Sequence, residues 1–231
     1  MDKLDRNGLE APMIFRAALV DGMGASVCIK HLKAGETLYV EGESADYCYE
    51  TVSGVMKEYN TLEDGKRQVA EFYKAGDMFG FSESDDQLHT AEAITACAVR
   101  CYPREAFMKT VAASPALSAS FLETLMTRLH RARERMVMIG RMSAMQRVAT
   151  FLLRLADNAD AEDDAHLAQF HLAMSRQDIA DHLGLTIETV CRTLTELKKR
   201  QIIVMESARV FAIADLASLE TVAMGARGRL H

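Results

Sequence analysis

Short apolar runs separated by glycines occupy the first half of the chain. From about residue 27 to 102, glycines recur every 7 to 12 residues, between runs such as TLYV, CYETV and RQVAEFY. The glycines are Gly35, Gly42, Gly54, Gly65 and Gly76. Turn signals at this spacing predict an antiparallel barrel or roll rather than a parallel sheet. The segment TLEDGKRQV, residues 61–69, predicts a hairpin, because Asp64 and Gly65 can adopt the positive φ angles of a tight turn.

A long helix is predicted next. Ser114 is a natural N-cap, and Pro115 suits the first helical position, where its missing N–H costs nothing. Apolar residues then follow a heptad spacing until the helix ends near Gly140. They are Leu122, Leu125, Leu129, Ala132, Met136 and Ile139. This seam is narrower than the face that a core helix usually shows, so it favours a parallel partner helix and a homodimer. Packing of the seam on the β-rich part is the alternative.

The last third of the chain mixes helix and strand patterns. Residues 143–157, SAMQRVATFLLRLAD, predict a second helix. Its inner side carries Met145, Val148, Phe151, Leu152 and Leu155. An acidic loop, DNADAEDD, follows at residues 157–164, and LAQFHL at 167–172 predicts a strand.

Residues 174–203, MSRQDIADHLGLTIETVCRTLTELKKRQII, have the form of a helix-turn-helix. Ser175 and Asp178 match the S-x-x-D capping box that opens a helix. Gly184 falls at the turn, which needs a residue with positive φ, and Thr186 is placed to cap the second helix. The segment RQIIVMESARVFAI behind it is typical of a wing. Three residues of the first helix are predicted to face inward: Ile179, Ala180 and Leu183.

The second helix of this motif has an apolar and a polar face. The apolar face carries Ile187, Val190, Leu194 and Leu197. The polar face carries Glu188, Arg192, Thr195 and Lys199, with Cys191 at its edge. Arginine is the commonest reader of guanine, and glutamate can accept from cytosine N4. An exposed i,i+4 ion pair is the alternative role for Glu188 and Arg192. The capped first helix, the glycine turn and the wing favour DNA reading.

The segment SRQDIADHLGLTIETVCRTLTELKK resembles the helix-turn-helix of the bacterial CRP/FNR family of transcription regulators, most closely its FixK-type branch. The predicted elements follow the family's order over essentially the whole chain. The resemblance implies an α+β fold with an N-terminal antiparallel β-roll, a cyclic-nucleotide-binding-like jelly roll, at residues 1–113. A dimerisation helix at 114–140 and a C-terminal winged helix-turn-helix domain at 141–231 complete it. It also implies a homodimer that binds double-stranded DNA and recruits RNA polymerase.

The recognition helix carries a specificity motif. In the family, E-x-x-S-R accompanies FNR-type sites of the TTGAT…ATCAA kind. Glu188, Cys191 and Arg192 give E-x-x-C-R and are the predicted base contacts, with Cys191 in place of the serine. The cyclic-AMP receptor branch has an arginine before the glutamate, whereas this chain has Ile187. An FNR-like target is therefore expected, and the resemblance implies activation of low-oxygen respiration genes. Predicted DNA-backbone contacts are Ser175, Arg176, Gln177, Thr186, Thr189, Thr195 and Lys199.

The β-roll of this family usually houses a sensor, and cyclic-nucleotide binding is one option. It uses a Gly-Glu-Leu turn and then an Arg-Ser or Arg-Thr pair whose arginine meets the phosphate. The corresponding stretch, residues 76–93, has no arginine and carries Glu83, Asp85 and Asp86. These carboxylates would repel a phosphate, so nucleotide binding is not expected.

The cysteines and histidines of the chain bear on an iron–sulfur cluster, on haem and on a cupin-like enzyme. An FNR-type iron–sulfur cluster needs three closely spaced cysteines near the N-terminus, whereas Cys28 is followed by a gap of 20 residues. Haem, with His31, His89 or Met78 as axial ligand, stays open as the alternative of a ligand-gated sensor. A cupin-like enzyme would need closely placed ligands such as an H-x-H pair, which the seven histidines lack. No cofactor, no metal and no enzyme activity are expected.

Composition narrows the class of protein further. Hydrophobic residues make up 49% and charged residues 26%, an ordinary globular composition. No run approaches the roughly 18 apolar residues of a membrane span, and the N-terminus has no signal-peptide core, so a cytoplasmic protein is expected. The net charge of −6 requires any DNA-binding surface to be a local basic strip.

The five cysteines are expected to be free thiols, and Cys191 stands out among them. A thiol on the DNA side of a recognition helix can be oxidised to sulfenic, sulfinic or sulfonic acid. The anionic products would oppose the DNA backbone. Arg192 favours the thiolate and Glu188 opposes it. The hypothesis is that oxidation at Cys191 switches DNA binding off, and the alternative is a thiol that only replaces serine.

Overall fold

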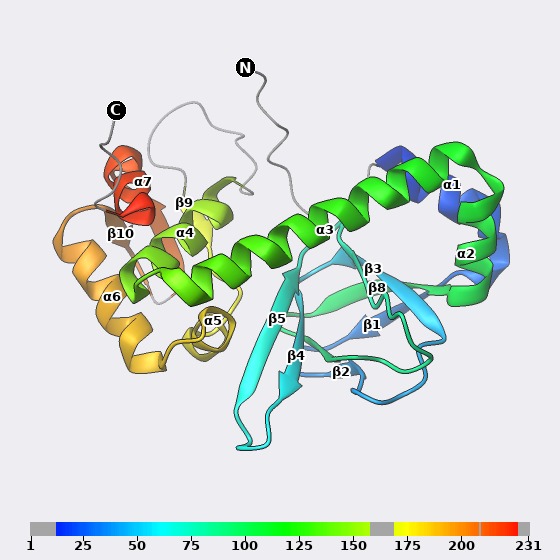
Figure 1. Ribbon diagram of the computed structural model, residues 1–231, viewed down its shortest axis with the longest axis horizontal. Helices are drawn as coiled ribbons and strands as arrows, with labels where there is room; N and C mark the ends of the chain where they lie inside the picture. The colour runs from blue at the N-terminus through cyan, green and yellow to red at the C-terminus, as the bar shows by residue number, and fades with distance from the viewer. Residues whose placement is uncertain (1–12, 158–168, 208, 226–231) are drawn as a thin grey trace. The chain divides into compact units, whose positions relative to one another are not determined.

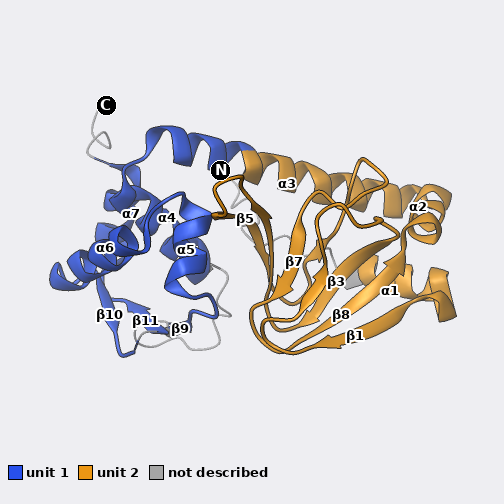
Figure 2. Cartoon of the chain, turned by 90° about the horizontal axis from the view of Figure 1, so that it is seen from below, with its two compact units in different colours: residues 1–7, 133–231 blue, residues 8–132 orange. Residues whose placement is uncertain are grey.

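The computed structural model describes residues 13–157, 169–207 and 209–225, which divide into two compact units (Figure 1; Figure 2). We call the unit that ends at Ala132, drawn in orange in Figure 2, the first unit, and the unit that begins at Arg133, drawn in blue, the second unit. The boundary falls inside α3 (Pro115–Arg141), so each unit contains part of this helix. Ser114 caps α3 as predicted, its hydroxyl accepting from the Leu117 amide at 3.4 Å. None of the described helices has the length and apolar character to cross a membrane.

The first unit is a roll of two four-stranded antiparallel sheets, which confirms the predicted roll. The sheet orders are β1-β8-β3-β6 and β2-β7-β4-β5. The strands are β1 (Cys28–Leu32), β2 (Thr37–Tyr39), β3 (Tyr47–Ser53), β4 (Met56–Thr61), β5 (Arg67–Tyr73), β6 (Met78–Phe79), β7 (Thr90–Ala93) and β8 (Cys97–Pro103).

The predicted hairpin is present, but its turn differs from the expectation. β4 and β5 pair up to Thr61 and Arg67, and the connection is closed by a bond from the Leu62 amide to the Lys66 carbonyl, 2.8 Å. Gly65 has a φ of 79°, whereas Asp64 does not take a positive φ. Its carboxylate instead accepts from the Lys66 amide at 3.0 Å and from Lys66 Nζ at 2.7 Å. The connection is therefore a loop longer than a two-residue turn, and the side chain of Asp64 stabilises it.

Aromatic side chains fill the interior of the roll. The rings of Tyr39, Tyr49 and Tyr73 stack on or against Phe79, with centroids 4.7–6.4 Å apart. The hydroxyls of Tyr39 and Tyr73 both donate to the buried carboxylate of Glu58. Burial and the charge of Glu58 raise the pKa of both tyrosines well above its usual value, which keeps both hydroxyls protonated as donors.

Two helices of the first unit were not predicted from the sequence. They are α1 (Met13–Met23) and α2 (Arg104–Ala113), and a 3-10 helix, η1 (Gly24–Ser26), joins α1 to β1. Phe15 and Leu19 of α1 and Phe107 of α2 are buried in one hydrophobic cluster. The same cluster includes Cys48 of β3, Met78 of β6 and Tyr102 of β8, so the two helices pack against the sheet that contains these strands.

The second unit contains the predicted winged helix-turn-helix. Its three-stranded antiparallel sheet has the order β10-β11-β9. The elements are α4 (Ala144–Asp157), β9 (Gln169–His171), α5 (Arg176–Leu183), α6 (Ile187–Lys199), β10 (Ile203–Met205), β11 (Val210–Ile213) and α7 (Leu216–Met224). Most of the predicted acidic loop and the start of the LAQFHL segment lie outside the described residues. Helix α7 was not predicted.

Candidate nucleic-acid interface

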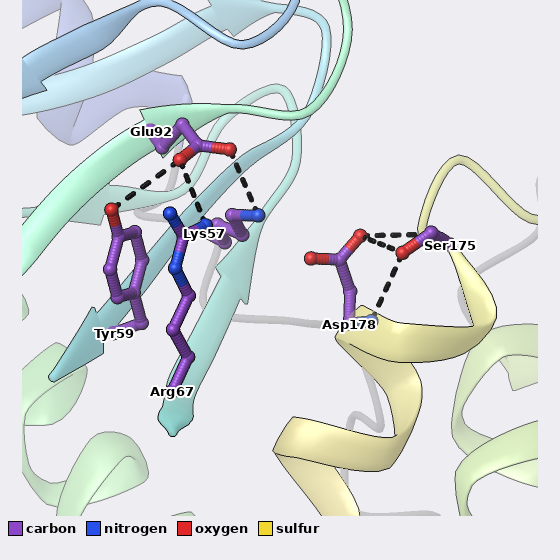
Figure 3. Close-up of polar contacts among 6 residues, drawn as sticks. All are labelled: Lys57, Tyr59, Arg67, Glu92, Ser175 and Asp178. Carbon is purple, nitrogen blue, oxygen red and sulfur yellow. Dashed lines mark hydrogen bonds and ion pairs between the residues drawn. The ribbon is translucent and has the colours of Figure 1, made fainter. Parts of the chain in front are cut away.

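A capping box fixes the start of α5. The Ser175 hydroxyl accepts from the Asp178 amide at 3.1 Å, and the Asp178 carboxylate accepts from the Ser175 amide at 3.0 Å (Figure 3). Two amides that have no partner within the helix are thereby satisfied. The capping box predicted from S-x-x-D is confirmed, and it fixes the register of the first helix of the motif.

The turn between α5 and α6 depends on one glycine and one threonine. Gly184 has a φ of 62°, in the left-handed region, and the Leu185 amide donates to the Ala180 carbonyl at 3.0 Å. Thr186 then caps α6, its hydroxyl accepting from the Thr189 amide at 3.3 Å. Both local predictions are confirmed, because each depends on chemistry within a few residues.

Helix α6 presents the predicted polar side chains to solvent. Val190, Leu194 and Leu197 are buried, and Ile187 is half-buried. The residues predicted for the polar side are all exposed: Glu188, Cys191, Arg192, Thr195 and Lys199. Thr193 is also buried, which the projection of the helix did not predict.

An i,i+4 ion pair was the alternative role for Glu188 and Arg192, but the pair that forms at the end of α6 joins Glu196 to Arg200 at 2.8 Å. In the described part of the chain no salt bridge joins Glu188 to Arg192. The backbone amide of Glu188 and then the Thr186 hydroxyl lower the pKa of the Glu188 carboxyl, so it is anionic at neutral pH. Both side chains are therefore exposed and available to an external partner.

Several predicted backbone-contact residues already take part in intramolecular bonds. The Thr195 hydroxyl donates to the Cys191 carbonyl at 2.9 Å, and Gln177 Nε2 donates to Asp181 at 2.6 Å. Ser175 and Thr186 act as helix caps. Lys199 is exposed, and Thr189 is half-exposed.

Arg176 is held close to the recognition helix by an aromatic ring. Its guanidinium lies over the Phe211 ring of the wing, 4.8 Å from the centroid. Burial lowers the pKa of Arg176, and an electrostatic interaction with Cys191 opposes this shift. The sequence suggested Arg192 as the cation near Cys191, whereas the structure adds Arg176. No local signal could reveal this, since the two residues lie on different helices.

Arg147 of α4 is a site residue that the sequence did not reveal. Its guanidinium donates to the carbonyls of Ile139 at 2.6 Å, Met142 at 3.1 Å and Leu183 at 2.9 Å. A longer bond of 3.3 Å reaches the Gly184 carbonyl. These carbonyls belong to the C-terminal ends of α3 and α5, where a helix leaves acceptors unsatisfied. One side chain thus joins the end of α3 to the turn that precedes the recognition helix.

The heptad seam of α3 is open in the single chain. All six predicted seam residues are exposed, with Met136 at 74% and Leu122 at 58%. They are Leu122, Leu125, Leu129, Ala132, Met136 and Ile139. Exposed apolar side chains in such a row are typical of a surface that another chain covers.

In the segment that corresponds to the family's phosphate-binding turn, the polar groups of residues 82–86 form hydrogen bonds with one another and with Arg104. The hydroxyls of Ser82 and Ser84 donate to the Asp86 carbonyl at 2.6 and 2.9 Å. Arg104 donates to the carbonyls of Ser82 and Ser84 at 2.9 and 2.6 Å. The predicted acidic residues, Glu83, Asp85 and Asp86, are all exposed here.

The residues considered for haem do not lie in one environment. Met78 is buried in the cluster around α1 and α2, His31 is exposed on β1, and His89 is half-exposed. Across the described ranges no three His, Cys, Asp or Glu side chains gather in a way that could hold a metal.

Glu92 lies at the centre of a group of charged and polar side chains in the first unit. Glu92 of β7 contacts Lys57 Nζ at 2.9 Å, and the Tyr59 hydroxyl and Arg67 Nη1 at 3.4 Å each (Figure 3). The Arg67 guanidinium also lies over the Tyr59 ring, 4.6 Å from its centroid. These contacts cross three neighbouring strands and hold the sheet together.

Comparisons with known proteins give the family of the chain. A Crp-like helix-turn-helix domain model matches residues 146–222, and a cyclic nucleotide-binding domain model matches residues 29–114. The nitrogen fixation regulation protein FixK of Rhizobium meliloti is 36% identical over 190 residues, which covers 82% of this chain and 84% of that protein. FixK of Bradyrhizobium diazoefficiens is 38% identical over 196 residues, which covers 80% and 81%.

The solved structures agree with the sequence comparison. The structure of FixK2 from Bradyrhizobium japonicum has a TM-score of 0.79 and 33% identity, and covers 85% of this chain and 96% of that chain. The predicted α+β fold is confirmed by this structural match and by the two matching domain models. The prediction that the chain is not an enzyme is also confirmed, since the relatives are transcription regulators. The chain belongs to the FixK branch of the CRP/FNR family of transcription regulators and carries that family's DNA-binding helix-turn-helix.

Proposed function

We propose that the chain is a transcription activator that binds an FNR-like palindrome of the TTGAT…ATCAA type as a homodimer. The observation that carries this proposal is the joint exposure of Glu188, Cys191 and Arg192 near the start of α6. A recognition helix contacts base edges with its N-terminal residues, and a cation such as Arg192 suits guanine. The remaining predicted contacts would position the helix on the phosphates: Ser175, Arg176, Gln177, Thr186, Thr189, Thr195 and Lys199.

The homodimer would form through the seam of α3. Pairing of two such seams would cover the exposed leucines and methionines and place one recognition helix on each half-site. In this arrangement residues 1–113 form the β-roll, 114–140 the dimerisation helix and 141–231 the DNA-binding domain. RNA polymerase is the further partner, and the regulator acts in the cytoplasm, where the DNA of a bacterium lies.

The target genes would be those of low-oxygen respiration. Two supporting relatives are named nitrogen fixation regulation protein FixK, and a further one, from Rhodopseudomonas palustris, is the transcriptional activatory protein AadR. The name of this relative favours activation over repression as the role of the chain.

The β-roll of this activator would bind no small-molecule cofactor. The rings of Tyr39, Tyr49, Tyr73 and Phe79 occupy its interior, and the turn at residues 82–86 satisfies its own polar groups. A cyclic nucleotide would need the space of these rings and a cation in place of the exposed carboxylates. A haem-gated or other ligand-gated sensor of the same fold is the competing proposal, which an absorption spectrum of the purified protein would test.

Cys191 would act as the redox control point of DNA binding. Its thiol is exposed between the two base-reading side chains, and Arg176 provides a second cation nearby. Oxidation would place negative charge where affinity depends on phosphate contacts. The test is DNA binding by the wild type and by Cys191→Ser, each with and without peroxide. Equal loss of affinity in both proteins, or no loss in either, would contradict the role.

DNA binding to defined duplexes tests the base-reading proposal. Replacing Arg192 by alanine should lower affinity for the palindrome by about 5- to 150-fold, while affinity for a scrambled duplex changes little. Arg200→Ala is the matched control, because Arg200 is an exposed arginine at the end of the same helix. It should leave the ratio of the two affinities unchanged. The assignment would be refuted if both variants lowered the ratio of palindrome to scrambled-duplex affinity equally. It would also be refuted if the wild type bound the two duplexes equally well.

A further inference from the structure

Two cysteines of the first unit face each other across neighbouring strands. In the antiparallel pairing of β1 with β8, Cys28 lies directly opposite Cys101. Such opposite residues point to the same face, with Cβ atoms about 4.5–5.5 Å apart. A disulfide joins Cβ atoms about 3.5–4.5 Å apart, so a small approach of the two strands would allow the bond.

The electrostatics of Cys101 also depend on Cys28. Burial raises the pKa of the Cys101 thiol to about 12, and the charge of Cys28 and a side-chain hydrogen bond with it act in the same direction. This influence of Cys28 on Cys101 agrees with the strand pairing, which places the two residues opposite each other.

The two thiols differ in their access to solvent. Cys28 is exposed, and Cys101 is buried. The other cysteines of the roll have no such partner, since Cys97 lies opposite Leu32 and Cys48 lies opposite Tyr102. An oxidant in solution would therefore react with Cys28 first. Cys101 would be the cysteine opposite the oxidised Cys28.

We propose that Cys28 and Cys101 form a redox-active dithiol, which peroxide oxidises to an intramolecular disulfide between β1 and β8. The Cys28 thiolate attacks one peroxide oxygen, the O–O bond breaks, and Cys28 becomes a sulfenic acid with release of water. The Cys101 sulfur then attacks the Cys28 sulfur, and the sulfenic oxygen leaves as a second water with the Cys101 proton. Two thiols and one hydrogen peroxide thus give one disulfide and two waters.

The disulfide would tie the first strand of the roll to the middle of its sheet. Cys101 also lies opposite Tyr49 on β3, so β8 connects both neighbours at this residue. The bond would close the chain from residue 28 to 101, which includes β2 to β7. Closure of such a loop restricts the unfolded chain, so oxidation should raise the melting temperature of the roll.

The experiment uses the full chain with Cys191→Ser as the background, which removes the exposed thiol of α6. The protein is treated with hydrogen peroxide, blocked with N-ethylmaleimide, digested without reductant and analysed by mass spectrometry. We expect a peptide pair joined through Cys28 and Cys101, together with a higher melting temperature, and dithiothreitol should reverse both. Cys48→Ser, which removes a buried cysteine without a cysteine opposite, should retain the cross-link.

Cys28→Ser is the decisive variant, because this exposed position tolerates serine and the protein should fold. It should lose the cross-link and the rise in melting temperature. Several results would overturn the proposal: no reaction at Cys28, its oxidation to sulfinic acid without a cross-link, or a disulfide between two chains.

Discussion

Replacing Arg147 by methionine tests whether this side chain fixes the turn before the recognition helix. Methionine retains much of the apolar stem and removes the three donors to Ile139, Met142 and Leu183. Each such hydrogen bond contributes about 1 kcal/mol net. The free energy required to open the hydrogen-bonded structure of α5 and α6 should therefore fall by about 3 kcal/mol. The longer bond to Gly184 is left out of this sum.

Native-state hydrogen exchange can measure this loss locally. Peptides from α5 and α6 should exchange faster by the factor that corresponds to the lost free energy, whereas peptides from the β-roll serve as an internal reference. Arg154→Met is the control on the same helix, because Arg154 forms an exposed ion pair with Glu134. Such a pair contributes about 0–1 kcal/mol. If Arg147→Met accelerates exchange no more than Arg154→Met, the assignment of Arg147 is wrong.

Three further predictions concern single positions. Gly184→Ala should destabilise the second unit by about 1–2 kcal/mol in hydrogen exchange, because its φ of 62° is unfavourable for a residue with a Cβ. Ser175→Ala should cost about 0.5–2 kcal/mol in the same assay, and retained protection of α5 would contradict its capping role. Burial raises the pKa of Asp77 to about 7, so the roll should gain stability as pH falls through that value. The melting temperature of Asp77→Asn should lack this dependence.

Features fixed by neighbouring residues were predictable from the sequence. The capping box of Ser175 and Asp178, the left-handed Gly184 and the cap at Thr186 each depend on a few consecutive residues, and all three are confirmed. The antiparallel roll was predictable for a similar reason, because its turns recur along the chain, and it is also confirmed. The DNA-contact residues on α6 remain a prediction, although their exposure agrees with it.

Features that depend on distant residues were not predictable. Arg147 binds backbone carbonyls, and no sequence pattern marks a carbonyl that needs a donor. Arg176 and Phe211 meet only after the wing folds beside α5. Helix α7 is different, because its N-cap is local: the Asp215 carboxylate accepts from the Ser218 amide at 2.9 Å. For Arg147 and Arg176 the partner lies on another element, so local spacing does not reveal the contact.

The stacked tyrosines of the roll also give the protein a selective optical signal. The chain has no tryptophan, and all six tyrosines belong to the first unit. They are Tyr39, Tyr47, Tyr49, Tyr59, Tyr73 and Tyr102. Intrinsic ultraviolet fluorescence therefore reports the roll and not the DNA-binding unit. A single tryptophan introduced into the second unit would add a separate emission, so that the unfolding of each unit could be followed in one cuvette.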